Sequence, residues 1–328
     1  MERVLLTGAT GFVGTHVYGA LVAAGFDVVC GTRDPERAAA REPHRTYRAL
    51  DVHVPEQVRA ALRDIDAAVY LVHGMRESAG YGQRERTAAA CFAQESAAAG
   101  LGRIVYLGGM RPRGSVSTHL ASRLVTGEVL RAGSVPTVEL QATMIVGGGS
   151  ESFRIVRDLA ARLPFMLLPR WLDSVSEPVA IADVATAIGF ALRMPLDESA
   201  VFTVPGPERL SGVEVLLRTA RLLGQKTFVV RVPFVTPRLS SYWIRLVTRA
   251  NPHIATELVQ GLLSDIVADD ESLWTRLPAH VRVTFDDAAR VALAEEDAQL
   301  TSVARLFERI MRPLARRREL LPPPSESR

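Results

Sequence analysis

Short aliphatic runs alternate with alanine-rich stretches from Met1 to about Val146. The runs have the length and β-branched content of buried strands, and the stretches between them have the length and composition of helices. This alternation is typical of βαβ units and predicts an α/β fold with a doubly wound parallel sheet and right-handed crossovers. The predicted strands are Val4–Leu6, Asp27–Cys30, Tyr47–Ala49, Ala67–Leu71, Arg103–Leu107 and Val138–Ile145, and the predicted helices are Phe12–Ala24, Pro55–Leu62, Arg84–Ala99 and Leu120–Ala132.

The pattern changes after the three glycines at 147–149. Phe153–Leu163 is predicted to be a helix, and Pro164–Leu172 is an apolar segment bracketed by prolines that we interpret as a loop. This loop is either a lid or pocket wall, or a buried connection beneath a second lobe. Pro178–Ile181 predicts a short strand, after which Asp183 is expected to be the N-cap of a helix that ends near Arg193 rather than a catalyst.

The last part of the chain predicts a smaller, mainly helical lobe. Ser211 is expected to cap a helix that Gly224 ends. We expect a nucleotide domain over 1–150, to which 176–205 return, a substrate lobe formed by 151–175 and 206–318, and a disordered tail at 319–328. The arginines at 316–318 suit a solvated helix end better than a membrane surface. The further elements predicted are strands Val201–Val204 and Thr227–Val232 and helices Ser211–Leu223, Pro237–Thr248, Ala255–Ile266 and Asp297–Arg318.

Composition narrows the class of protein. The chain has 328 residues, 48% of them hydrophobic, and a formal net charge of +3, which is too small to argue for nucleic-acid binding. No apolar stretch reaches the roughly 20 residues that span a bilayer, and the sequence starts with a core strand rather than a signal peptide. We therefore expect a cytoplasmic protein without integral membrane association. The oligomeric state is left open.

The reactive side chains exclude some chemistry. Cys30 and Cys91 fall inside a predicted strand and a predicted helix, which fits reduced, buried thiols. Their positions offer no metal-ligand spacing, so no metal site is expected. Lys226 is the only lysine of the chain. Most mechanisms that need a lysine beside a cofactor are therefore disfavoured.

Three glycines stand where the first predicted strand turns into the first predicted helix, in the sequence Thr7–Gly14. Gly8 permits a tight turn, Gly11 lets the backbone approach a pyrophosphate, and Gly14 lets the helix pack closely on the strand. The helix N-terminus then faces the phosphates. The sequence therefore predicts a Rossmann-type dinucleotide site, to which Thr10, Phe12 and Val13 of the same turn also contribute.

The end of the second strand bears on which dinucleotide binds. An enzyme that prefers NAD usually has a carboxylate there, which binds the adenosine ribose. This chain has Thr32 and Arg33 instead, a hydroxyl and a guanidinium that suit a 2′-phosphate, so NADP(H) is favoured over NAD(H). Alternatively, Arg33 pairs with Asp34 or Glu36, or stacks on the adenine whether or not the phosphate is present.

These motifs resemble the short-chain dehydrogenase/reductase superfamily, specifically its atypical NAD(P)H-binding members of the YbjT-like and NmrA-like subgroup, which are related to epimerases and dehydratases. The resemblance implies a cofactor groove lined by Asp51, Val52, Leu71, His73 and Gly108. His73 is equally well interpreted as a hydrogen-bonded loop residue. The resemblance rests on the Thr7–Gly14 turn, the Asp51-Val52 pair, and the segments Tyr70–Met75, Arg103–Gly109, His119–Arg123, Leu163-Pro164, Pro169–Trp171 and Pro237–Trp243.

The chain departs from the superfamily at the catalytic position. The resemblance implies a tyrosine and a lysine four residues later, but here the matching residues are His119 and Arg123, and Gly109 and Met110 replace the usual serine. His119 becomes the candidate proton donor to a substrate oxygen, and Arg123 the candidate to bind the nicotinamide ribose or stabilise negative charge. Alternatively, both residues are structural and catalysis is left to the cofactor and a water.

The leading hypothesis is an NAD(P)H-dependent reductase of a carbonyl or conjugated enone. The presumed pocket is apolar, which suits an aromatic or polyketide-like specialised metabolite. Two alternatives stay open: a catalytically silent NAD(P)-binding regulator or assembly factor, and an epimerase or dehydratase. The predicted substrate-binding residues are Met110, Phe165, Met166, Trp171, Tyr242 and Trp243.

Overall fold

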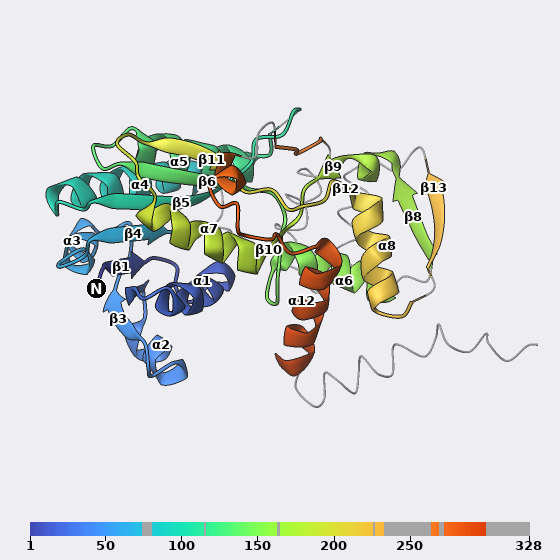
Figure 1. Cartoon of the computed structure of the whole chain (residues 1–328), viewed down its shortest axis with the longest axis horizontal. Helices are drawn as coiled ribbons and strands as arrows, with labels where there is room; N and C mark the ends of the chain where they lie inside the picture. Colours follow the sequence, from blue (N-terminus) through green and yellow to red (C-terminus); the bar gives the residue numbers. More distant parts are fainter. Residues whose placement is uncertain are drawn as a thin grey trace, which may run out of the picture.

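A computed structural model describes residues 1–73, 81–114, 116–162, 165–225, 227–232, 264–268 and 272–299 of the chain. Its centre is a seven-stranded, entirely parallel sheet in the order β11-β6-β5-β4-β1-β2-β3 (Figure 1). The predicted α/β fold with a doubly wound parallel sheet is therefore confirmed. The strands are β1 (Arg3–Leu6), β2 (Asp27–Thr32), β3 (Thr46–Ala49), β4 (Ala67–Tyr70), β5 (Arg103–Gly109), β6 (Thr137–Ala142) and β11 (Ala200–Thr203).

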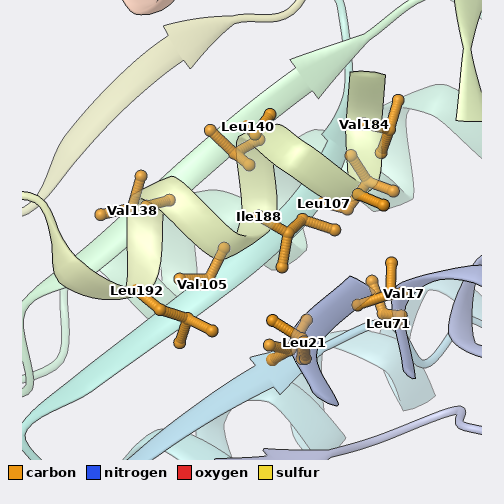
Figure 2. Packing of buried hydrophobic residues seen from close by; sticks show 14 of the residues in the cluster. Val17, Leu21, Leu71, Val105, Leu107, Val138, Leu140, Val184, Ile188 and Leu192 are labelled. Carbon is orange, nitrogen blue, oxygen red and sulfur yellow. The ribbon is translucent and has the colours of Figure 1, made fainter. Parts of the chain in front are cut away.

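Helices cover both faces of the sheet because its strands are apolar on both sides. Helices α1 (Phe12–Ala23) and α7 (Ile181–Arg193) pack against one face, where Val17 and Leu21 of α1 meet Ile188 of α7 (Figure 2). The opposite face carries α3 (Pro55–Ala61), α4 (Tyr81–Ala98) and α5 (Thr118–Arg131). Two buried apolar layers thus hold the strand ends in fixed positions.

Most of the predicted elements before residue 146 are confirmed within one to three residues at their ends. Helix α2 (Pro35–Arg41) was not predicted, although Asp34 caps it by accepting a hydrogen bond from Arg37 N at 3.0 Å. The strand predicted over Val138–Ile145 is confirmed as far as Ala142, but it does not continue unbroken to Ile145. The chain instead leaves the main sheet after Ala142 and forms β7 (Ile145–Val146), which pairs with β10 (Val179–Ala180).

The other elements gather at the opposite end of the molecule in Figure 1. Helix α8 begins after Ser211, which forms a capping box with Glu214, and Gly224 follows its end with φ +70°, as predicted. These elements are α6 (Glu151–Arg162), β8 (Phe165–Pro169), the 3-10 helix η1 (Arg170–Asp173), β9 (Val175–Ser176), β12 (Leu210–Ser211), α8 (Gly212–Leu222), β13 (Phe228–Val232) and α12 (Phe285–Gln299). The short helix α11 (Ser272–Thr275) instead packs on the main sheet, where Leu273 and Trp274 join its core.

The predicted loop over Pro164–Leu172 is corrected by the structure. Phe165–Pro169 is strand β8, which pairs in parallel with β13, and a 3-10 helix follows it. Pro169 is accommodated because, among the described strands, β8 pairs with β13 alone, so one of its edges needs no backbone donor.

Asp183 is not the N-cap of α7, contrary to the prediction. The N-cap is Ala180, and Asp183 lies in the first turn with no exposed surface. Its carboxylate accepts a hydrogen bond from Val283 N at 2.9 Å and lies 2.8 Å from His280 Nε2. The carboxylate therefore ties α7 to a segment one hundred residues later in the chain.

Some predictions fall outside the described residues. These are Tyr242 and Trp243, the helix over Pro237–Thr248, almost all of Ala255–Ile266, and residues 300–328, which include most of the predicted tail helix and the tail. Residues 297–299 belong to α12, which begins at Phe285, and that helix was not predicted.

Candidate functional site

The glycine turn has the geometry that the sequence predicts. Gly8 has φ +63°, in the left-handed region that favours glycine, and Gly11 N donates to Gly8 O at 3.0 Å. A Cβ at Gly14 would collide with the Gly8 carbonyl oxygen and would lie 2.7 Å from Ala9 Cα. Close packing of the helix on the turn therefore requires glycine at position 14.

The N-terminus of α1 presents backbone donors next to this turn. Its N-cap, Gly11, has no side chain to satisfy them. Thr10 and Gly11 are exposed, and Phe12 and Val13 are half-buried. An anion placed here would meet backbone N–H groups and the positive end of the helix dipole.

Strand β4 ends directly beside the glycine turn. Leu71 N donates to Thr7 Oγ1 at 2.9 Å, and a Cβ at Gly8 would lie 3.2 Å from Leu71 O. His73 follows two residues later, and its Nδ1 lies 3.1 Å from Leu71 O. A neutral imidazole in this contact carries its proton on Nδ1, so its Nε2 is left as an acceptor.

The carboxyl end of β5 adds an arginine and a second histidine. Arg123 of α5 donates from Nη2 to Leu107 O at 3.0 Å, and its own backbone oxygen accepts from the Tyr106 hydroxyl at 2.9 Å. His119 lies one helical turn before Arg123, and its ring centroid is 6.2 Å from that of His73. We call His73, His119 and Arg123 the histidine–arginine cluster.

Both imidazoles of this cluster are held in the neutral form. Desolvation, followed by the charge of Arg123 and the nearby His119, lowers the pKa of His73 to about 3. Desolvation, followed by the charge of Arg123, lowers the pKa of His119 to about 4. The guanidinium is therefore the charged group of the cluster at neutral pH.

The end of β2 leaves Arg33 available to a ligand. Arg33 is exposed, and no ion pair with Asp34 or Glu36 occurs among the described residues. Asp34 instead caps α2, and its N–H lies 3.4 Å from Thr32 Oγ1. This geometry leaves the adenine-stacking alternative open but removes the proposed surface pairing.

The Asp51-Val52 pair lies past β3. Asp51 Oδ1 accepts a hydrogen bond from His53 N at 3.0 Å, and Asp51 N donates to Gln57 Oε1 at 2.8 Å. Val52 is buried in the core. The turn places the half-buried Asp51 at the same strand edge as Thr32 because β2 and β3 are adjacent and parallel.

The candidate substrate residues are spread over two regions. Met110 is buried at the end of β5, where its N–H donates to Ala142 O at 3.1 Å, next to Gly108 and Gly109. Phe165 and Met166 belong to β8, and Trp171 belongs to η1.

One contact at this edge was missed by sequence reasoning. Glu295 of α12 accepts a hydrogen bond from Gly148 N at 3.0 Å, and the same oxygen lies 3.5 Å from Nε2 of His16 on α1. The rings of His16 and Phe12 are in edge-to-face contact, with centroids 5.3 Å apart. Because Gly148 and Glu295 are 147 positions apart, no local pattern in the sequence predicts this contact.

The strand order, the glycine turn and the polar groups at the carboxyl edge define a dinucleotide-binding Rossmann domain. Residues 8–135 match the model of a family described as NAD(P)H-binding. This match agrees with the NAD(P)H-binding site that the motifs of this segment predict.

Two relatives are similar in sequence. A ceramide reductase of Caulobacter vibrioides is 25% identical over 241 residues, which are 70% of this chain and 73% of that protein. An isonitrile lipopeptide synthase of Streptomyces coeruleorubidus is 40% identical over 68 residues. That match covers 20% of this chain and only 5% of the synthase.

Solved structures share the fold. Citrobacter sp. triphenylmethane reductase aligns with a TM-score of 0.71 at 16% identity, over 89% of this chain and 99% of that one, and it has also been solved with NADP(H). The UDP-glucose 4-epimerase of Thermus thermophilus, solved with NAD, aligns with a TM-score of 0.65 at 16% identity, over 91% of this chain and 100% of that one.

The described residues contain neither a membrane-spanning helix nor a cluster of metal ligands. No helix among them is long and apolar enough to cross a membrane. No group of three or more histidine, cysteine, aspartate or glutamate residues in the described ranges could hold a metal ion.

Proposed function

We propose that this protein is an NAD(P)H-dependent reductase that acts on a carbonyl or conjugated enone of an apolar molecule and prefers NADPH. One observation carries the proposal. Hydrogen bonds and close contacts link the glycine turn through Thr7 and Leu71 to His73, and so to the histidine–arginine cluster at the same strand edge. A dinucleotide seated on the turn would extend along this edge.

The residues present fit the cofactor. Gly8, Gly11 and Gly14 shape the turn, and the uncapped α1 N-terminus suits the pyrophosphate. The exposed Arg33 suits a 2′-phosphate. The reduced nicotinamide, when bound, supplies a hydride to the substrate carbon.

The histidine–arginine cluster has to manage the charge that develops on the substrate oxygen. When hydride adds to the carbonyl carbon, the C=O π electrons move to oxygen. The Arg123 cation stabilises this oxyanion, and a neutral His119 can donate an N–H hydrogen bond to it. Because His119 is neutral at pH 7, the proton that completes the alcohol comes through its N–H or from water rather than from a resting imidazolium.

The substrate pocket is proposed to combine the end of β5 near Met110 with the lobe formed by 151–175 and 206–318. By their names, one relative acts on ceramide and one fold neighbour acts on triphenylmethane dyes. These names support an apolar substrate for this chain and do not identify it.

The test is cofactor consumption. The full chain is mixed with NADPH or NADH and a panel of aromatic and aliphatic aldehydes, ketones and enones, and both the cofactor and the product are quantified. A reductase consumes one NADPH for each alcohol or saturated ketone formed. Calorimetric binding of NADPH without consumption across the panel would instead identify a silent binding protein. Product formed without net consumption would identify an epimerase or dehydratase.

A further inference from the structure

We propose that the histidine–arginine cluster receives an anionic group of the substrate, so that the preferred substrate carries a carboxylate next to its apolar body. This inference rests on the proposed function, because it concerns the substrate of the same site. It narrows the substrate from apolar carbonyl compounds in general to acidic ones.

The first support is the set of contacts that Arg123 makes. Its guanidinium donates to one backbone oxygen, Leu107 O, and its Nε is buried without a hydrogen-bond partner. Within the described part of the chain, no carboxylate lies within ion-pair distance of Arg123. A partly buried cation that lacks a counter-ion is costly, and an anionic ligand would offset that cost.

The second support is that the nearby buried carboxylates are engaged elsewhere. Glu139 on the adjacent strand β6 pairs with Arg131 at 2.8 Å and accepts from Gln141 Nε2 at 3.0 Å. Glu85 of α4 accepts a hydrogen bond from Ser122 Oγ. Among the described residues, neither carboxylate forms an ion pair with Arg123.

The third support is the character of the groups beside the guanidinium. His73 and His119 lie next to each other, as neutral imidazoles, on the side of the cluster that continues from β4. Because both imidazoles are neutral, they add no charge of their own, and the cluster keeps a formal charge of +1. Guanidinium and carboxylate form charge-assisted hydrogen bonds, which are about twice as strong as neutral ones.

The cofactor's own phosphates do not explain this charge. The pyrophosphate is expected at the glycine turn and the α1 N-terminus, and the 2′-phosphate at Arg33, which follows β2 on the other side of β1. Arg123 lies beyond β4, at the end of β5. The group that Arg123 attracts is therefore assigned to the substrate.

The test compares benzoate with benzamide, which have the same shape but differ in charge. Each is titrated by calorimetry into the full chain saturated with NADPH, whose nicotinamide is uncharged. The proposal predicts that benzoate binds at least about tenfold more tightly than benzamide. Equal affinities, or no binding of benzoate, would overturn it.

Two variants assign the preference to Arg123. Arg123→Gln should abolish the preference for benzoate, and Arg123→Lys, which keeps the charge, should retain part of it. The matched control is Arg111→Gln, because Arg111 is exposed at the same end of β5 and pairs weakly with Glu128 at 3.9 Å. A preference that survives in a folded Arg123→Gln protein, or that disappears in Arg111→Gln, would overturn the proposal.

An activity assay on the same wild-type and variant proteins tests the anion site and the reductase activity independently. Benzoylformate and its methyl ester are assayed for NADPH consumption. If benzoate binds selectively through Arg123 but no carbonyl compound is reduced, the anion site stands and the reductase proposal fails. If the ester and the acid are reduced equally well, the reductase proposal stands and the anion site fails.

Discussion

Two histidine clusters in this molecule are built in opposite ways. In one, His280 lies 2.8 Å from the carboxylate of Asp183, whose other oxygen accepts from Val283 N, and the ring stacks on Trp274 with centroids 5.4 Å apart. In the other, His73 and His119 lie beside the Arg123 cation, and no described carboxylate pairs with it. The first cluster is internally satisfied, whereas the second is not.

This difference in hydrogen-bond partners distinguishes a polar cluster that stabilises the fold from one that is available to a ligand. Asp183 is completely buried and joins α7 to residues 280–283, so its hydrogen bonds hold the fold together. The histidine–arginine cluster lies at the carboxyl edge of a parallel sheet, where ligands of this fold class bind. Its uncompensated charge and partnerless Nε are consistent with a site that a ligand completes.

The largest expected effect is on stability, at the satisfied cluster. Asp183→Ala leaves Val283 N and His280 without their buried acceptor, and should lower the free energy of unfolding by about 3–5 kcal/mol. Urea denaturation followed by circular dichroism measures this change. Asp183→Asn, which keeps an acceptor oxygen, should cost less. If both variants were as stable as the wild type, the structural role would be refuted.

The next effect is on activity, at the unsatisfied cluster. Arg123→Gln should lower kcat/KM by about 10²–10³, because it removes a charge that acts on the developing oxyanion. The unfolding midpoint should change little, since the substitution removes the hydrogen bond to Leu107 O and the contact with Tyr106 but leaves no buried charge unpaired. Steady-state assays and thermal melts on the same sample check both parts. Parallel losses of activity and stability would contradict the contrast between the clusters.

Acidification should change the contributions of the two clusters to the free energy of unfolding in opposite directions. The folded-state pKa values of His73 and His119 lie below the ordinary value of 6.5, so the stability tied to their neutral forms is present above pH about 6.5 and is lost as pH falls toward about 4. Each contributes a slope of up to about 1.4 kcal/mol per pH unit. In urea titrations across this range, His73→Gln should lose less stability than the wild type on acidification.

The contribution of Asp183 to stability should depend on pH in the opposite way to that of His73 and His119. Desolvation raises the pKa of its carboxyl, so the folded state binds a proton more readily than the unfolded state does. This contribution makes the protein more stable as pH falls. Asp183→Asn removes it and should therefore lose stability more steeply than the wild type on acidification. A shallower loss would show that the sign assigned to Asp183 is wrong.

The smallest effect is expected at the far end of the cofactor groove. Arg33→Ala should weaken NADPH by about tenfold and leave NADH almost unchanged, since the guanidinium would bind the 2′-phosphate. Calorimetric titration with both cofactors measures the ratio. Arg37→Ala, an exposed arginine one turn into α2, is the control. Equal weakening of both cofactors by Arg33→Ala would favour stacking on the adenine.

The sequence predicted those features that depend on local chemistry. The glycine turn and the six strands near it were found because β-branched runs, glycine spacing and helix periodicity act over a few residues. The Ser211 cap and the Gly224 stop were found for the same reason.

The errors share a physical cause, because each depends on partners far away in the chain. Strand β8 was taken for a loop, since its pairing with β13 lies 63 residues further on. The predicted Asp183 cap was wrong because the carboxylate binds residues 97 and 100 positions later. The sequence was enough to select the three residues of the histidine–arginine cluster. The lack of a described ion pair at Arg123 became visible only when the structure showed where the neighbouring carboxylates lie.

The most direct test of the contrast between the two clusters follows the histidine rings by NMR while NADPH is added to the full chain. Variants His73→Gln, His119→Gln and His280→Gln assign the three imidazoles. The account predicts that the resonances of His73 and His119 shift as the cofactor saturates, while those of His280 stay in place. Unchanged His73 and His119 resonances at saturation, or an equal shift at His280, would contradict it.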